Sequence, residues 1–269
     1  MNKFLLSIVF FLLVLASVSA QRHELGVFAG GSYYLGDLNP SGHFEQSQPA
    51  VGLIYRYNIN PRWAIRVNAL FGSVEASDAV NNKNNPRNLS FKSPITEFSV
   101  LTELNFVQFY TKSEKYRFTP YIFAGLGIFN FNPQAQYEGK WYELQPLGTE
   151  GQGVAGGKSL YALTNANFPF GIGIKIGLFK VVCVGLEWGM RKTFTDYLDD
   201  VSTTYVKASV FNTNDEYSTI ATILADRSEV KHIAGAQRGN SSNNDWYNFY
   251  GVTISFHLGK KESTCSSFK

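Results

Sequence analysis

The sequence predicts an all-β fold, namely an eight-stranded antiparallel up-and-down transmembrane β-barrel with a packed polar lumen and long extracellular loops. Eight segments alternate apolar and polar side chains with a period of two. The gaps between them alternate between a few residues and a few dozen, as in a barrel with short turns on one side of a membrane. Beyond the first 20 residues, no stretch approaches the roughly 20 continuous apolar residues of a membrane-spanning helix.

The alternation is clearest in residues 181–192, where apolar side chains from Val182 to Met190 share one face and Glu187 and Arg191 lie on the other. Four further segments repeat it regularly, at residues 48–60, 62–74, 168–179 and 246–258. Three less regular segments are also predicted to be strands, at residues 22–35, 95–110 and 118–131. Because a charged face cannot look into lipid, we expect the polar faces to line the lumen.

The chain begins like a secreted protein. Lys3 precedes an apolar run at residues 4–16, and Val18-Ser19-Ala20 supplies the small residues at which a signal peptidase cleaves. The predicted organisation is therefore a signal peptide at residues 1–20, a barrel at 21–258 and a periplasmic C-terminal tail at 259–269. The residue directly after the cleavage site is Gln21 and not the cysteine that would carry a lipid, so we do not expect a lipid-anchored precursor.

The composition favours a surface that faces lipid. Aromatic residues make up 15% of the chain and charged residues 17%, against about 25% charged in typical soluble proteins. The net charge is only +3 and the basic residues are scattered, which does not indicate binding to nucleic acid. Eight strands and their loops leave little room for a second folded domain.

The gap lengths predict an orientation in the cell outer membrane. If both termini are periplasmic, the short connections at residues 58–61, 111–116 and 179–180 are periplasmic turns. The long connections are then extracellular and are rich in Asn, Ser, Gly and charge, as solvated loops are, at residues 36–47, 75–94, 132–167 and 193–245.

Aromatic side chains on the predicted lipid face gather at both ends of the strands, as at the two membrane interfaces. Those near the periplasmic end are Tyr57, Trp63, Phe106, Tyr110 and Phe256. Those near the outer end are Tyr33, Phe71, Phe98, Phe168, Trp188 and Tyr250. A soluble lipocalin-like barrel is the alternative, in which the apolar face would point inward.

Charges of both signs lie on the predicted inner face: Glu24, Arg56, Arg66, Glu97, Glu103, Lys175, Glu187 and Arg191. An eight-stranded barrel is just wide enough for side chains to fill it. We therefore expect these groups to pair with one another in a structural network, and an ion or proton path is the alternative.

No motif for catalysis or for a cofactor emerges. The histidines are His23, His43, His232 and His257, and neither of the two in outer loops has a serine and an acid at a spacing that supports a triad. The run GTEGQGVAGG at residues 148–157 lacks the flanking strand and helix of a phosphate loop, although Gly157-Lys158-Ser159 follows, and is predicted to be a flexible outer loop. We expect no enzymatic activity.

Two other groups of residues allow more than one interpretation. Asp196, Asp199 and Asp200 could bind calcium, but no ordered loop spacing supports this, and a solvated acidic turn is favoured; we expect no metal. Cys183 lies near the start of the seventh predicted strand and Cys265 just past the end of the eighth, so they could form a disulfide across neighbouring strands or remain free.

Three segments carry a family resemblance: RHELGVFAGGSYYLGDLNP at residues 22–40, TPYIFAGLGIFNFNP at 119–133 and GLEWGMRKTFTDYLDDVSTTY at 185–205. Together they resemble the family of small Bacteroidota outer-membrane β-barrels that includes PorG of the type IX secretion system. The resemblance implies a non-enzymatic barrel in outer-membrane lipid that anchors the periplasmic PorK/PorN ring of that machinery. The alternative is a stand-alone barrel with a surface-binding or envelope-stabilising role.

The resemblance also draws attention to two motifs at the outer rim and to the tail. The rim residues are Gly36, Asp37, Asn39, Asp196, Asp199 and Asp200. Asp and Asn stabilise tight turns through their own backbone, so folding of the rim is favoured over direct ligand binding. A partner ring would lie in the periplasm, where the basic tail offers candidate contacts at Lys260, Lys261 and Lys269.

Overall fold

The computed structural model describes residues 22–81, 86–111, 113–154, 157–179, 181–211 and 216–258. The predicted signal peptide lies outside these residues, as does the tail with Lys260, Lys261, Cys265 and Lys269. No helix within the described ranges is both long and apolar enough to cross a membrane.

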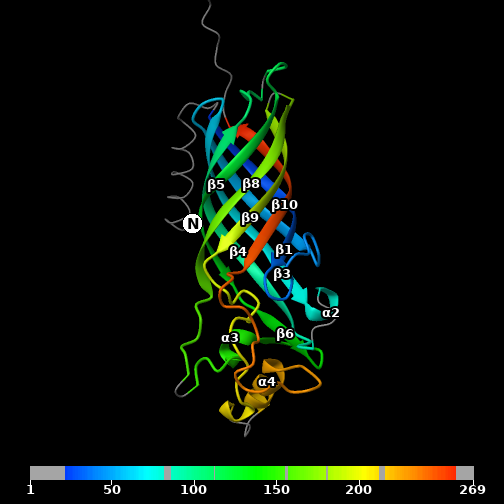
Figure 1. Cartoon of the computed structure of the whole chain (residues 1–269). Coiled ribbons are helices and arrows are strands. Elements are labelled where there is room, and N and C mark those ends of the chain that lie inside the picture. Colours follow the sequence, from blue (N-terminus) through cyan, green and yellow to red (C-terminus); the bar gives the residue numbers. More distant parts are fainter. Residues whose placement is uncertain are drawn as a thin grey trace, which may run out of the picture.

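Eight long strands form one closed antiparallel barrel (Figure 1). They are β1 (His23–Leu35), β2 (Gln48–Asn58), β3 (Trp63–Ser77), β4 (Ser90–Asn105), β5 (Phe118–Phe131), β8 (Thr164–Leu178), β9 (Val182–Thr193) and β10 (Trp246–Leu258). Each pairs with the next along the chain, and β1 pairs with β10, with Leu25 opposite Phe256, to close the ring. The predicted eight-stranded up-and-down transmembrane barrel is confirmed.

The barrel turns its apolar face outward. Leu53 is 57% exposed on the outer wall of β2, whereas Arg56, three residues further on, is 1% exposed inside. Successive strand side chains point to opposite sides, and exposed apolar side chains alternate with buried side chains along most of the wall, as in β4. This arrangement is the reverse of a soluble barrel and excludes the lipocalin-like alternative.

Three strands extend further than the alternation predicted, and the first of them is β8, which begins at Thr164 rather than at residue 168. β3 runs to Ser77 and β4 begins at Ser90, so most of the predicted loop at 75–94 is a hairpin with a short helix, α2 (Asp78–Asn81), near its tip. Ala76 and Phe91 pair across the hairpin and are buried, which explains why the strands continue. At its other end β4 stops at Asn105 rather than Tyr110.

The two longest predicted loops fold into a compact cap at one end of the barrel (Figure 1). We define the cap as residues 132–163 and 194–245. It contains β6 (Gln134–Tyr137), β7 (Lys140–Glu143), α3 (Leu144–Leu147), the 3-10 turn η1 (Ala208–Val210) and α4 (Glu216–Ala225). Its apolar core is continuous with the lumen, since Leu147, Leu198 and Leu224 belong to the same buried cluster as Phe129. The interpretation of these segments as solvated loops is therefore wrong for the described residues.

Candidate functional site

Glu103 lies at the centre of an ion-pair network inside the barrel. Arg56 donates from Nε to Glu103 Oε2 at 3.1 Å and from Nη1 to Glu24 Oε2 at 2.6 Å. The Lys175 ammonium donates to the other oxygen of Glu103. β1, β2, β4 and β8 therefore meet through four charged side chains, each at most 2% exposed.

The same network continues across the lumen to β9. Arg66 Nη1 donates to Glu187 Oε2 at 2.7 Å and lies 3.6 Å from Glu103 Oε2. The Tyr121 hydroxyl also donates to Glu187, at 2.9 Å. Three cations and three carboxylates thus compensate one another, which buried charges require.

Arg191 and Glu97 form a second, separate group nearer the cap. Arg191 Nε donates to Glu97 Oε2 at 3.1 Å, and the Tyr247 hydroxyl donates to the same oxygen at 2.8 Å. The structure thus places all eight predicted charges in the lumen, but in two groups rather than one. Rings complete the packing, with the Phe123 ring 4.6 Å from the Arg66 guanidinium carbon and Phe249 4.8 Å from that of Arg191.

Glu150 is the central acceptor of a buried hydrogen-bond and ion-pair network in the cap. Its carboxylate accepts the backbone N–H of Ser202 at 2.9 Å, the hydroxyl of Thr203 at 2.6 Å and Nη1 of Arg238 at 3.0 Å. Gly148, at φ 59°, ends α3 in the left-handed conformation and turns the chain toward these partners. Residues 148–152 of the glycine-rich run are therefore packed, and the prediction of a flexible loop is wrong for these residues.

At the rim, one tyrosine hydroxyl joins two carboxyl groups. Tyr34 Oη lies 2.5 Å from Asp199 Oδ2 and 2.7 Å from Asp245 Oδ1. A hydroxyl carries one proton and can donate to only one of them, so the other carboxyl must itself carry a proton. Burial raises the pKa of Asp199 and of Asp245 well above the usual value, which favours that state.

The remaining rim residues bond to backbone. Asn39 Nδ2 donates to the Tyr34 carbonyl at 2.8 Å, and Gly36 and Asn39 exchange backbone hydrogen bonds at 3.0 and 3.1 Å. Asp37 Oδ2 accepts the Asn240 N–H at 2.7 Å. Asn39 therefore bonds to nearby backbone, as in a tight turn, whereas Asp37 joins two segments that lie 203 residues apart in the chain.

Asp196 and Asp200 lie where burial disfavours the ionised form of their carboxyl groups. Burial raises the pKa of Asp196 to about 7 and that of Asp200 to about 6. Arg238 and the hydroxyls of Thr149 and Tyr161 oppose the rise at Asp200. Among the described residues, no three or more His, Cys, Asp or Glu side chains are grouped so that they could hold a metal ion.

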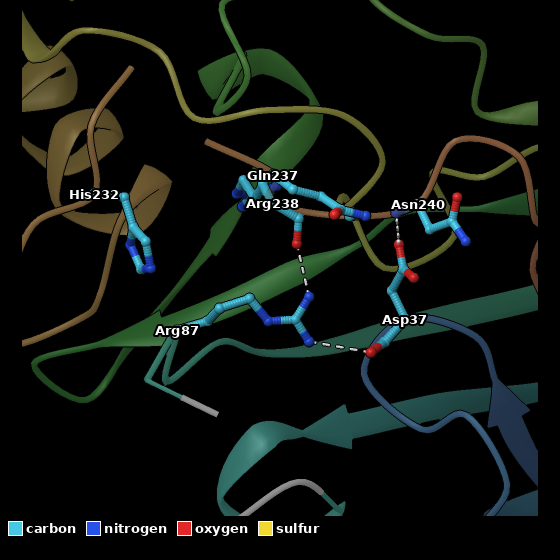
Figure 2. Close-up of a pocket in the computed structure, with 7 residues that line it drawn as sticks. Asp37, Arg87, His232, Gln237, Arg238 and Asn240 are labelled. Carbon is cyan, nitrogen blue, oxygen red and sulfur yellow. Dashed lines mark hydrogen bonds between the residues drawn. The ribbon is translucent and has the colours of Figure 1, made fainter. Parts of the chain in front are cut away.

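One cavity, of about 270 Å³, lies at the edge of the cap (Figure 2). Asp37, Arg87, His232, Gln237, Arg238 and Asn240 line it. Arg87 reaches between two loops, donating to the carbonyls of Arg238 at 2.7 Å and Asp37 at 3.1 Å (Figure 2). The groups that face this cavity therefore hold the cap together.

His232 has the partners of a triad without its geometry. Asp226 Oδ1 and Ser228 Oγ both lie 3.2 Å from the same ring nitrogen, Nδ1. In a Ser-His-Asp triad the serine and the acid bind opposite nitrogens. The ring stacks on Tyr205 with centroids 4.1 Å apart. His232 therefore packs the loop.

Tyr33 differs from its predicted place in the outer aromatic girdle. The loop between β1 and β2 folds back over it, with His43 Nδ1 3.0 Å and Trp188 Nε1 2.9 Å from its hydroxyl. At the opposite end of the barrel, His257 Nε2 lies 3.4 Å from Glu24 Oε1 in the lumen. Cys183 is buried, and Cys265, with which it could form a disulfide, lies outside the described residues.

The sequence patterns did not identify four residues that make these contacts, namely Tyr34, Glu150, Arg238 and Asp245. Their partners are distant in the chain, Arg238 lying 88 residues from Glu150 and Asp245 211 residues from Tyr34. Charged residues embedded in loops otherwise rich in Gly, Ser and Asn were the one local signal.

Several solved structures match this chain at low sequence identity. They include the N-terminal β-barrel domain of Pseudomonas aeruginosa OprF (11% identity, covering 87% of this chain and 97% of that one, TM-score 0.36). Neisserial surface protein A shows 8% identity, coverage of 87% and 96% and a TM-score of 0.42. Pseudomonas aeruginosa OprG shows 10% identity, coverage of 89% and 98% and a TM-score of 0.40.

No curated protein shows significant sequence similarity to this chain. One family does match, and it covers residues 3–226, which is most of the barrel and of the cap. The chain therefore belongs to the family described as a domain of unknown function, DUF6089.

Proposed function

We propose that this protein is a closed, non-enzymatic barrel of the cell outer membrane, with the cap outside the cell and the short turns and termini in the periplasm. One observation carries the proposal: the lumen is filled by compensated ion pairs, and the cap core continues directly above it. Such an interior leaves no aqueous path, so the work falls to the surfaces at the two ends.

Two measurements test the closed barrel and its orientation. Reconstituted protein should show little conductance in planar bilayers, and large, steady single-channel currents would contradict the proposal. A membrane-impermeant maleimide should label Asn243→Cys in the cap on intact cells but not Glu114→Cys in a short turn. Both side chains are exposed, so the reverse pattern would overturn the orientation.

At the periplasmic end we propose a PorG-like role, in which the barrel anchors the PorK/PorN ring of the type IX secretion system. The support is the resemblance of the three segments at residues 22–40, 119–133 and 185–205. The partner surface would be formed by the short turns and by the tail with Lys260, Lys261 and Lys269, whose charge suits an acidic partner.

Deleting residues 260–269 and co-purifying the barrel with the ring proteins tests this role. Loss of the ring proteins would place the contact in the tail, and retention would move it to the turns. A triple change of Lys260, Lys261 and Lys269 to Gln separates charge from length. Failure of the full chain to capture the ring proteins would reject the role.

The cap favours a second candidate, a stand-alone barrel that binds a partner outside the cell. Ordering a backbone costs about 1–2 kcal/mol per residue, so a folded cap needs an extensive core. Its core includes Leu144, Leu198 and Leu224. A genome without other type IX components would favour this candidate, and dependence of secretion on the barrel would reject it.

A further inference from the structure

We propose that a second cavity, formed by cap residues, binds a saccharide, through one uncharged, polyhydroxylated sugar ring. The cavity encloses about 580 Å³, within the usual size range of small-molecule sites. Its lining includes Gln152, Tyr161, Tyr197, Ser202, Thr203 and Ser241. This inference goes beyond the anchoring role and does not depend on it.

A rigid aromatic stack forms part of the lining. The rings of Tyr161 and Tyr197 are parallel within 8°, with centroids 4.6 Å apart, and Phe131 continues the stack behind Tyr161. Leu160, at the same cavity, adds an exposed apolar side chain. A sugar ring presents a face of C–H groups, which packs on such a surface without requiring a charge.

A buried amide at the cavity helps to orient the aromatic stack. Gln152 is 4% exposed, and its Oε1 accepts the Glu150 N–H at 2.9 Å. Its side chain also hydrogen-bonds to Tyr197, which helps to fix the orientation of that ring.

The charges around the cavity favour a neutral ligand. Glu150, behind it, is paired with Arg238, and the Tyr161 hydroxyl donates to Asp200 at 2.8 Å. Lys158 is the one ionised side chain among the lining residues. The Thr203 hydroxyl donates to Glu150 and can still accept, and the exposed Ser241 hydroxyl can donate or accept, which matches the mixed hydrogen bonding of sugar hydroxyls.

Saturation-transfer NMR on the full chain in lauryldimethylamine oxide micelles, a detergent without sugar, tests the proposal. The probes are glucose, galactose, mannose, rhamnose and N-acetylglucosamine. At least one should receive saturation, strongest at the C–H protons of one ring face. Tyr197→Ala should weaken binding by about tenfold or more, because it removes the platform.

Because Tyr197→Ala could disturb the cap, Ser241→Trp serves as a second variant. Ser241 is exposed at the cavity, so a large ring there should block it and abolish saturation without unfolding. The matched control is Tyr217→Ala, an exposed tyrosine of α4 outside the cavity, which should bind as the unchanged chain does.

Two further probes separate the possible sources of the sugar. Equal binding of lipopolysaccharide and its delipidated polysaccharide would indicate a site that reads the sugar alone. Binding of intact lipopolysaccharide only, still blocked by Ser241→Trp, would indicate a membrane glycolipid. Absence of saturation with every probe, or saturation unaffected by both cavity variants, would overturn the proposal.

Discussion

Arg238 donates to Glu150 at 3.0 Å in the centre of the cap, where the two side chains are 2% and 1% exposed. Arg238 also donates to the carbonyls of Ala225, at the end of α4, and of Asp200. The buried Arg238 side chain, which also lies 3.7 Å from Asp200 Oδ2, therefore ties the β5–β8 connection to both ends of the β9–β10 connection. The order of the cap depends on it more than on any local sequence preference.

Replacing Arg238 by Met should unfold the cap while the barrel remains closed. Removing one partner of a buried pair costs about 3–5 kcal/mol, because the other charge stays buried and uncompensated. Limited proteolysis should then cut within residues 194–245. Lys207→Ala, an exposed change in the same segment, is the control and should leave the cap resistant. Equal resistance of Arg238→Met would show that the apolar core alone orders the cap.

Arg66→Met should destabilise the barrel by a similar amount, about 3–5 kcal/mol, because Glu187 would lose its partner at 2.7 Å. The double change Arg66→Met with Glu187→Met should recover most of this loss, since an apolar pair of similar size needs no compensation. Urea unfolding in micelles, followed by tryptophan fluorescence, measures both. A double variant less stable than the single one would show that Glu187 is held mainly by Tyr121.

The cap should be more stable at pH 5 than at pH 8. Burial raises the pKa of Asp196 to about 7 and that of Asp200 to about 6, whereas an unfolded aspartate titrates near 3.9. The folded cap therefore binds more protons between about pH 4 and 7, and its stability falls as the pH rises through that window. Asp226 has a lowered pKa, so its contribution to stability changes only below about pH 4, outside this window.

Thermal unfolding followed by near-UV circular dichroism checks this dependence, because the stacked tyrosines of the cap report on its order. Asp196→Asn should flatten the profile and raise the melting temperature at pH 8. A profile that rises toward pH 8 would contradict the direction of the shifts.

Two changes at one position separate charge from hydrogen bonding at the rim. Asp199→Asn should keep the hydrogen bond that the Val201 N–H donates at 2.9 Å in the unchanged chain. The change removes the negative charge, so the Asn side chain should behave like the protonated acid. Asp199→Ala should cost about 1–3 kcal/mol, because Tyr34 and Val201 lose an acceptor. Melting temperatures at pH 8 should rank Asn above Ala. A fully stable Ala variant that loses a binding activity would instead favour a ligand role for the rim.

The barrel could be predicted because its rule is local. In β9, Glu187 and Arg191 alternate with apolar residues, and the period of two alone assigns them to the lumen. The two ends of β3 and β4 were placed less well. There Ala76 and Phe91 are buried in a cluster that also contains cap residues such as Leu147 and Leu224, and the alternation along a single strand does not predict such packing.

Alternation and gap length were thus sufficient for the strand number, the inward and outward faces and the eight lumen charges, because each is a property of neighbours along the chain. The partners of those charges and the whole of the cap required the folded molecule. Glu150 meets Arg238, and Asp245 meets Tyr34, across 88 and 211 residues. Such contacts depend on how loops of no regular period pack on one another, and that packing leaves no periodic trace in the sequence.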